Sequence, residues 1–191
     1  MATVTHHLAV ERVEGLEPHE LAALCDATNA AIVEGGGFGW VEAQSRSALE
    51  RHFGGVLLVP ERELFVARLD GEVVGSAQLV RPPRNNEAQA FSATLTHAFI
   101  APYARGHGLA RLLVRRVEER AAAAGVRVIN LDVRSTQETA ITLFEGLGYT
   151  RWGTHPAYAR VNGATVEGFF YYRLLETPRG RSTGAALGIS E

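Results

Sequence analysis

The sequence predicts a single α/β (α+β) domain, with a mixed and largely antiparallel sheet of about seven strands flanked by about four helices. Its 191 residues suit one domain with a proper core. The first half carries short apolar strands and a strong hairpin signal, and the second half alternates helical and strand patterns. We expect the domain to span residues 1–176 and residues 177–191 to form a mobile C-terminal tail.

Two signals organise the first half of the chain. Leu21, Leu24 and Ala31 recur at helical spacing. Asp70-Gly71, between two apolar runs, is a strong hairpin signal, and the prolines of RPPRNNEAQ would interrupt a ladder. The predicted elements are strands over 7–13, 63–69, 73–80 and 91–100 and helices over 17–33 and 45–52, with GGGFGW and RPPRNNEAQ as loops.

Helices alternate with strands in the second half. Leu109, Leu113 and Val117 recur at helical spacing, and Gly125 supplies a C-terminal stop. Gly148 ends a second helical pattern in the same way. The predicted elements are helices over 108–125 and 136–147 and strands over 126–133, 149–155 and 168–175, with HPAYARVNG as a loop between the last two strands.

Composition and charge narrow the classes of function. The formal net charge is −2, so no basic field points to nucleic acid. No apolar run approaches the roughly 20 residues that cross a bilayer, and the amino terminus lacks the pattern of a secretory signal. We expect no nucleic-acid or membrane partner and a cytoplasmic location. We also expect Cys25 to be a buried hydrophobe and no metal to be bound, because His6-His7 is an isolated pair.

The turn between the fourth strand and the long helix carries the clearest chemical signal. Pro102 ends the strand, and Gly106 and Gly108 permit backbone conformations that side chains would block. The first N–H groups of the following helix lack internal partners and carry the positive end of the macrodipole, and Arg105 adds a full charge. The turn therefore suits a diphosphate, yet it lacks the Gly-Lys-Ser/Thr of a Walker A loop and the three glycines of a dinucleotide fingerprint. A purely structural turn is the alternative.

Two motifs are compared with known families. Arg105 to Ala110 reads R-x-x-G-x-A, and Thr136 to Thr150 reads TQETAITLFEGLGYT. In both motifs the chain resembles the GNAT superfamily of acyl-coenzyme A dependent N-acetyltransferases, where the first motif holds the coenzyme's pyrophosphate and the second lies beside the pantetheine. The resemblance covers roughly residues 63 to 175, and the run LDVRSTQETAITLFEGLGYTRWGTHPAY is most similar to the tabtoxin-resistance type. It implies acetyl-CoA as co-substrate, bound by Ala98, Phe99, Ile100, Arg105, Gly106, His107, Gly108, Leu109, Ala110, Gln137 and Phe144.

The resemblance also implies an activity. It implies direct transfer of an acetyl group from the thioester to a primary amine of a small molecule, and the sequence offers no obvious nucleophile for a covalent intermediate. A non-catalytic protein of the same fold that binds or senses acyl-CoA is the alternative. In the superfamily a backbone N–H at a bulge of the fourth strand binds the oxyanion, which points here to Phe99 or Ile100. The identity of the amine and the oligomeric state, possibly a homodimer, stay open.

Two side chains are candidates for the general base. His97 is one, because an imidazole has a pKa near the working pH, and a histidine half-covered by a neighbouring helix is the alternative. Strand parity places His97 on one face with Leu95 and Phe99, unless a bulge changes that parity. Asp132 at the end of the fifth strand is the other, acting directly or through water, with capping of the following turn as its alternative.

Three further positions bear on the chemistry. Phe144 stands where the superfamily commonly has a Tyr that protonates the departing thiolate, so Tyr158 or Tyr172 is the candidate acid. Gln137 stands where Asn is usual, and its amide predicts a shifted contact with the coenzyme. At His107 we expect the backbone N–H to matter more than the imidazole ring.

Overall fold

The structure is a computed structural model that describes residues 5–36 and 39–176. The strands are β1 (Leu8–Val13), β2 (Arg62–Leu69), β3 (Glu72–Val80), β4 (Ser92–Ile100), β5 (Val128–Arg134), β6 (Thr150–Val161) and β7 (Ala164–Leu174). The α-helices are α1 (Pro18–Val33), α2 (Arg46–Leu58), α3 (Leu109–Ala123) and α4 (Glu138–Gly146), and Glu87–Gln89 and Pro102–Ala104 form short 3₁₀ turns.

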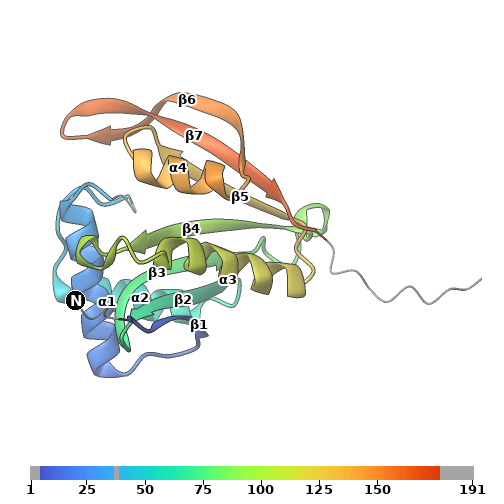
Figure 1. Cartoon of the computed structure of the whole chain (residues 1–191). Helices are drawn as coiled ribbons and strands as arrows, with labels where there is room; N and C mark the ends of the chain where they lie inside the picture. Colours follow the sequence, from blue (N-terminus) through green and yellow to red (C-terminus); the bar gives the residue numbers. More distant parts are fainter. Residues whose placement is uncertain (1–4, 37–38, 177–191) are drawn as a thin grey trace, which may run out of the picture.

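All seven described strands form one sheet in the order β1-β2-β3-β4-β5-β7-β6 (Figure 1). The pairing of β4 with β5 is parallel, and the other neighbouring strands pair antiparallel. This arrangement confirms the fold class that the sequence predicts. The predicted tail, residues 177–191, lies outside the described residues.

Local sequence signals explain where several elements begin and end. Asp70 and Gly71 have φ values of 52° and 91°, so the predicted hairpin between β2 and β3 turns through the left-handed region. Ser45 accepts a hydrogen bond from the backbone N–H of Ala48 at 3.3 Å and so caps α2. Pro18 occupies the first turn of α1, where a missing N–H costs nothing.

The closing hairpin differs from the sequence prediction. Its strands β6 and β7 run to a two-residue turn at Asn162 and Gly163, whose φ values are 49° and 81°. The segment HPAYARVNG is therefore mostly strand rather than loop. Pro156 is accommodated because the register between β6 and β7 shifts between His155 and Ala159. As a consequence Tyr158 projects from a strand.

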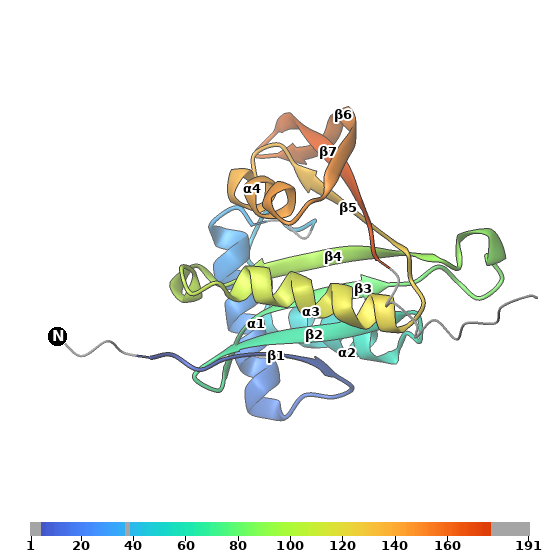
Figure 2. The same ribbon diagram turned by 45° about the vertical axis from the view of Figure 1, so that its right-hand side comes forward.

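Helices cover both faces of the first four strands (Figure 2). One apolar cluster packs α3 and α4 on the sheet and includes Phe65, Leu113 and Phe144. A second cluster packs α1 and α2 on the opposite face and includes Leu64 and Phe53. Adjacent residues of β2 thus serve opposite clusters, as strand alternation requires.

The single cysteine of the chain is buried. Cys25 lies in the cluster beneath α1 and is 1% exposed, which confirms that it is a buried hydrophobe. Burial raises the pKa of its thiol to about 11, so the thiol stays protonated at neutral pH.

The centre of the sheet opens where β4 leaves β5. The two strands pair in register only from Ser92 with Val128 to Thr94 with Asn130. Beyond these pairs β5 continues beside β7, while β4 continues beside β3. The carboxyl ends of β4 and β5 therefore diverge, and Figure 1 shows the resulting separation of the two halves of the sheet.

Candidate functional site

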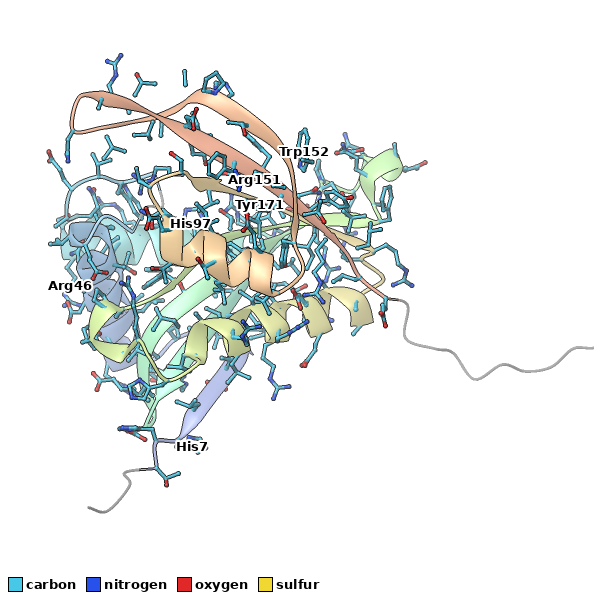
Figure 3. The ribbon with its side chains drawn as sticks, turned by 45° about the horizontal axis from the view of Figure 1, so that its top comes forward. His7, Arg46, His97, Arg151, Trp152 and Tyr171 are labelled. Atoms are coloured by element: carbon cyan, nitrogen blue, oxygen red, sulfur yellow. The ribbon has the colours of Figure 1, made fainter. Side chains whose placement is uncertain are left out.

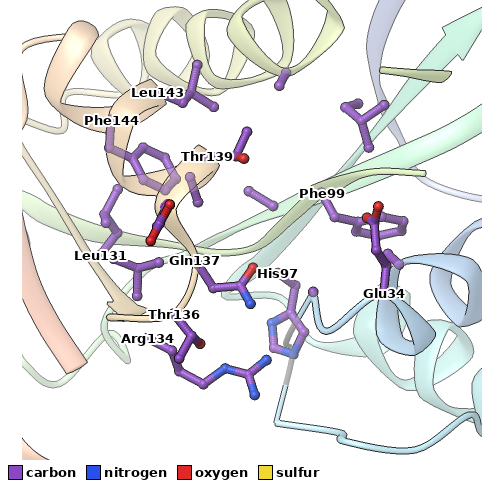
Figure 4. Close-up of a pocket in the computed structure, with 18 of the residues that line it drawn as sticks. Glu34, His97, Phe99, Leu131, Arg134, Thr136, Gln137, Thr139, Leu143 and Phe144 are labelled. Carbon is purple, nitrogen blue, oxygen red and sulfur yellow. The ribbon is translucent and has the colours of Figure 1, made fainter. Parts of the chain in front are cut away.

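A cleft of about 1130 Å³ is lined by both diverging strands. Its walls also include the end of α1, the turn before α3, most of α4 and the last residues of β6. Figure 4 shows His97, Gln137 and Arg134 gathered in one part of this cleft, with Leu131, Leu143 and Phe144 in another. The cleft thus has a polar region near the β4 bulge and an apolar region beneath α4.

A β-bulge shapes the β4 wall. The register passes from Ser76 opposite Phe99 to Gln78 opposite Thr96, so β4 carries one extra residue relative to β3. His97 lies at this irregularity with a φ of 51°, a left-handed conformation that is uncommon for a residue with a side chain.

The bulge corrects the predicted parity of the strand. Leu95 packs in the cluster beneath α3, whereas Phe99 packs against the cluster beneath α1 and α2. Leu95 and Phe99 therefore do not share a face, as uninterrupted alternation would require. The extra residue at the bulge reverses the alternation, and Ala98 and Ile100 pack on the α3 side.

Backbone pairing separates the two candidates for the oxyanion donor. Ala101 donates its N–H to the carbonyl of Val74 at 2.8 Å, so these residues form a hydrogen-bonded pair. Such pairs alternate along an antiparallel ladder, so Ile100, opposite Gly75, turns its N–H away from β3 toward the opening. Phe99 belongs to the next hydrogen-bonded pair, so its N–H faces β3.

The turn before α3 presents an open helix end to the cleft. Gly106 and Gly108 have φ values of 86° and 82°, the conformations that the sequence predicts for them. The helix begins with a bond from the N–H of Leu112 to the carbonyl of Gly108 at 3.1 Å. Within the described residues no side chain caps this end, and its first turn holds no acidic residue. The preceding N–H groups therefore remain available to an anion.

Arg105 and His107, beside these glycines, point in different directions. Arg105 forms an ion pair with Glu34 at the end of α1 and donates from Nε to the carbonyl of Ile100 at 3.3 Å. The His107 ring packs edge-on against His6 at 4.7 Å. His107 is not among the described residues that line the cleft, unlike the other residues predicted to bind the coenzyme.

The surroundings of His97 favour its neutral imidazole form. His97 is partly buried at the wall of the cleft, and Figure 3 labels its position. Burial, with smaller contributions from His52 and Arg62, lowers the pKa of His97 to about 4. The expectation of a pKa near the working pH is therefore wrong, because the sequence does not show how far the ring is desolvated. Its Nδ1 lies 3.0 Å from Oγ1 of Thr96.

Asp132 and Tyr158 face the cleft as a pair. The Tyr158 hydroxyl donates a hydrogen bond to the carboxylate of Asp132. Burial, and then this hydrogen bond, raise the pKa of Tyr158 well above its usual range, so the hydroxyl is protonated at neutral pH. The ring occupies the space beside Gly168 on β7, where a Cβ atom would overlap it. Glycine at this position therefore permits the pair.

The start of α4 is tied to the end of α1. The Gln137 amide and the Arg134 guanidinium both donate to the carbonyl of Gly35, the latter at 3.2 Å. Arg134 is 9% exposed and lines the cleft. Phe144 is 7% exposed and packs edge-on against Tyr149 at 5.5 Å, consistent with an apolar wall.

The structure gathers most of the predicted site residues. The cleft is lined by His97, Ala98, Phe99, Ile100, Arg105, Gly106, Gly108, Leu109, Ala110, Asp132, Gln137, Phe144 and Tyr158. Sequence analysis missed Arg134 and the contact partner His52. No local pattern signals them, because each acts across a large separation in sequence.

The described residues lack two features, a membrane-spanning helix and a cluster of metal ligands. No described helix is long and apolar enough to span a membrane. Over residues 5–36 and 39–176, no group of three or more His, Cys, Asp or Glu side chains could hold a metal ion.

Comparisons with known proteins agree on one family. Residues 28–149 match the model of the acetyltransferase (GNAT) family. The chain is 60% identical over 130 residues to an uncharacterized N-acetyltransferase from the hisH–hisA intergenic region of Azospirillum brasilense. That alignment covers 68% of this chain and 77% of the relative.

Solved structures share the fold at low identity. A Salmonella typhimurium protein solved with its cofactor acetyl-CoA has a TM-score of 0.71 at 18% identity, covering 93% of this chain and 98% of that one. The spermidine N-acetyltransferase of Vibrio cholerae, solved with CoA and spermine, has a TM-score of 0.71 at 22% identity, covering 88% and 95%.

Proposed function

Because the chain belongs to the acetyltransferase (GNAT) family, we propose that it transfers the acetyl group of acetyl-CoA directly to a primary amine of a small molecule. The observation that carries this proposal is the open N-terminus of α3, where two glycines with positive φ precede uncapped N–H groups at the wall of the cleft. These groups suit the diphosphate of the coenzyme, because backbone N–H donors and the helix dipole both favour an anion there.

The coenzyme's reactive end fits the opening between the strands. Phe144, Leu131 and Leu143 supply an apolar wall beneath α4 for the pantetheine. Ile100 directs its N–H into the opening, where it can bind the carbonyl oxygen of the thioester. In the transition state this oxygen becomes an oxyanion, and a fixed donor stabilises it more than the ground state. Of the two predicted donors, Ile100 is therefore the one we propose.

Proton transfer is proposed for three residues, which lie on three strands that line the cleft. An amine has a pKa near 10, so it must lose a proton before it can attack at neutral pH. Neutral His97 on β4 is the proposed base, and Asp132 on β5 remains a second candidate. The Tyr158 hydroxyl, held by Asp132, is the proposed donor to the departing thiolate. Phe144 cannot serve in this role.

The size and surroundings of the acceptor end favour a small amine. The contacts of Gln137 and Arg134 with Gly35 tie α4 and β5 to the end of α1 beside His97 (Figure 4). We infer that this connection leaves less room beside His97 for a protein terminus than for a small amine. The resemblance to the tabtoxin-resistance type points the same way, and the spermidine N-acetyltransferase is a relative in fold that acts on a small amine. The subtype, the homodimer and the cytoplasmic location stay predictions.

Thiol release from acetyl-CoA with a panel of small primary amines tests the proposal. Amine-dependent release with one acetyl group gained per thiol supports direct transfer. Calorimetric binding of acetyl-CoA without release for any amine would favour a binding or sensing protein instead. Absence of both binding and release would contradict the proposed site.

A further inference from the structure

A second and much smaller cavity adjoins the cleft at the β4 bulge. Its volume is about 10 Å³, and His97 and Phe99 line both spaces. The other walls come from α1, α2 and β3 and include His52, Ser76 and Gln78. This cavity lies on the sheet face that α1 and α2 cover. Its volume corresponds to about one water molecule.

Two buried polar atoms in its walls lack protein partners. Ser76 and Gln78 are 0% exposed, and neither Ser76 Oγ nor Gln78 Nε2 makes a hydrogen bond to any described residue. The other amide atom of Gln78, Oε1, accepts a hydrogen bond from Arg62 at 2.8 Å, which fixes the orientation of the amide. Leaving a buried polar group without a partner is costly, so a water partner would be strongly favoured.

His52 approaches His97 across this cavity. Their ring centroids are 5.6 Å apart with an interplanar angle of 38°. The His52 ring packs edge-on against Trp40 at 4.9 Å and Phe53 at 5.1 Å, so its position is fixed by neighbours. His52 is only half-buried, and it therefore connects the interior with solvent.

Burial, followed by nearby charges, favours the neutral form of both rings. Burial lowers the pKa of His52 and of His97, and Arg62 on β2 lowers both further. Asp132 on β5 acts in the opposite direction on His97, but burial outweighs it. A proton that reaches either ring at neutral pH is therefore passed on rather than retained.

We propose that this cavity holds one ordered water, and that the water and His52 carry a proton from His97 to solvent during acetyl transfer. The inference rests on the proposed function with His97 as the base. An amine that enters the cleft as an ammonium requires such an exit, because it loses two protons when it becomes an amide and only one of them ends on the thiol. One N–H bond of the ammonium breaks as an N–H bond forms on His97. That proton then passes through the water to His52, and His97 returns to its neutral form.

The water can be tested without any activity. A high-resolution crystal structure of the protein without substrates is expected to contain one ordered water bonded to Ser76 Oγ and Gln78 Nε2. An empty cavity would contradict the proposal whatever the enzyme acetylates. This measurement therefore separates a failure of the inference from a failure of the proposed function.

Two substitutions test the role of His52. His52→Phe keeps an aromatic ring against Trp40 but cannot carry a proton, and we expect kcat to fall at least about tenfold with unchanged affinity for acetyl-CoA. His52→Ala is expected to lose a similar factor and to leave a space that imidazole can enter. Added imidazole should restore most of kcat in His52→Ala, but not in His52→Phe, and should leave the unaltered protein unaffected.

The outcomes distinguish proton transfer from packing. Wild-type kcat in His52→Phe would overturn the proposed role of His52, and so would a loss in His52→Ala that imidazole does not restore. Melting temperatures of both variants show whether a loss of kcat reflects unfolding. The amine-dependent thiol release of the unaltered protein, measured alongside, reports on the proposed function itself.

Discussion

The hydroxyl of Tyr158 donates a hydrogen bond to the carboxylate of Asp132, which joins a residue of β6 to a residue of β5 at the wall of the cleft. Tyr158 is the proposed proton donor to the departing thiolate. Replacement by Phe removes only the hydroxyl, so Tyr158→Phe is expected to lower kcat about tenfold to a hundredfold. Affinity for acetyl-CoA should stay within about twofold, because the ring remains. Steady-state thiol release measures kcat, and calorimetry measures the affinity for acetyl-CoA. An unchanged kcat would exclude Tyr158 as the acid.

Gly168 provides an independent way to displace the same hydroxyl. A Cβ atom at this position would overlap the Tyr158 ring. Gly168→Ala is therefore expected to move the ring away from Asp132, to lower kcat about as much as Tyr158→Phe, and to cost about 1–3 kcal/mol of unfolding free energy. Gly153→Ala is the matched control on β6, because its Cβ would lie 3.9 Å from Cβ of Phe170, an ordinary contact. If Gly168→Ala and Gly153→Ala have the same kcat, the position of the Tyr158 ring does not matter for catalysis.

The α3 turn predicts a separation between backbone and side chain in coenzyme binding. Gly108→Ala introduces strain at a φ of 82° and shifts the N–H groups that face the cleft. We expect at least about a tenfold loss of acetyl-CoA affinity by calorimetry. His107→Ala is expected to change affinity by less than about twofold, because the His107 ring contacts His6 instead.

Gly125 supplies the control for backbone strain. Its φ is 87°, close to that of Gly108, but it follows the opposite end of α3. Gly125→Ala should therefore lose a comparable amount of unfolding free energy and retain acetyl-CoA affinity. If both alanine variants lose affinity equally, strain alone explains the effect and the anion site is wrong.

The lowered pKa of His97 predicts the pH dependence of stability. An unfolded histidine has a pKa of about 6.5, whereas burial holds the pKa of His97 at about 4. Between these values the unfolded chain binds a proton that the folded protein excludes. The contribution of neutral His97 is therefore complete above about pH 6.5 and is lost as the pH falls toward 4.

Urea denaturation at several pH values measures this contribution. Between pH 7 and pH 4.5 the unfolding free energy of the unaltered protein should fall by about 1–2 kcal/mol more than that of His97→Asn. Asparagine is the chosen replacement because it tolerates the left-handed conformation that His97 adopts. Parallel pH curves would show that His97 is not held neutral by the fold.

Local signals predicted most of the fold because they act between near neighbours in the chain. The Asp70-Gly71 turn, the α3 periodicity and the helix stop at Gly125 all follow from such signals and are present. The Asn162-Gly163 turn carries an equally strong hairpin signal, which the sequence analysis did not use. Pro156 made the preceding segment resemble a loop, and a register shift near it resolves the conflict.

Properties that depend on a partner strand or helix could not be predicted. Alternation assigned Leu95 and Phe99 to one face, but the extra residue of β4 is defined only by its register with β3. The pKa of His97 depends in the same way on burial beneath elements far along the chain. The ion pair of Arg105 with Glu34 likewise joins residues far apart in the chain, so no local pattern predicts it.

A crystal structure with acetyl-CoA tests the central claim most directly. We expect the diphosphate to accept hydrogen bonds from the backbone N–H groups of residues 106–110, and the thioester carbonyl to accept one from Ile100. The acetyl group should then face His97 and Tyr158 across the opening between β4 and β5. A coenzyme bound elsewhere, or one whose diphosphate avoids the α3 turn, would contradict the account.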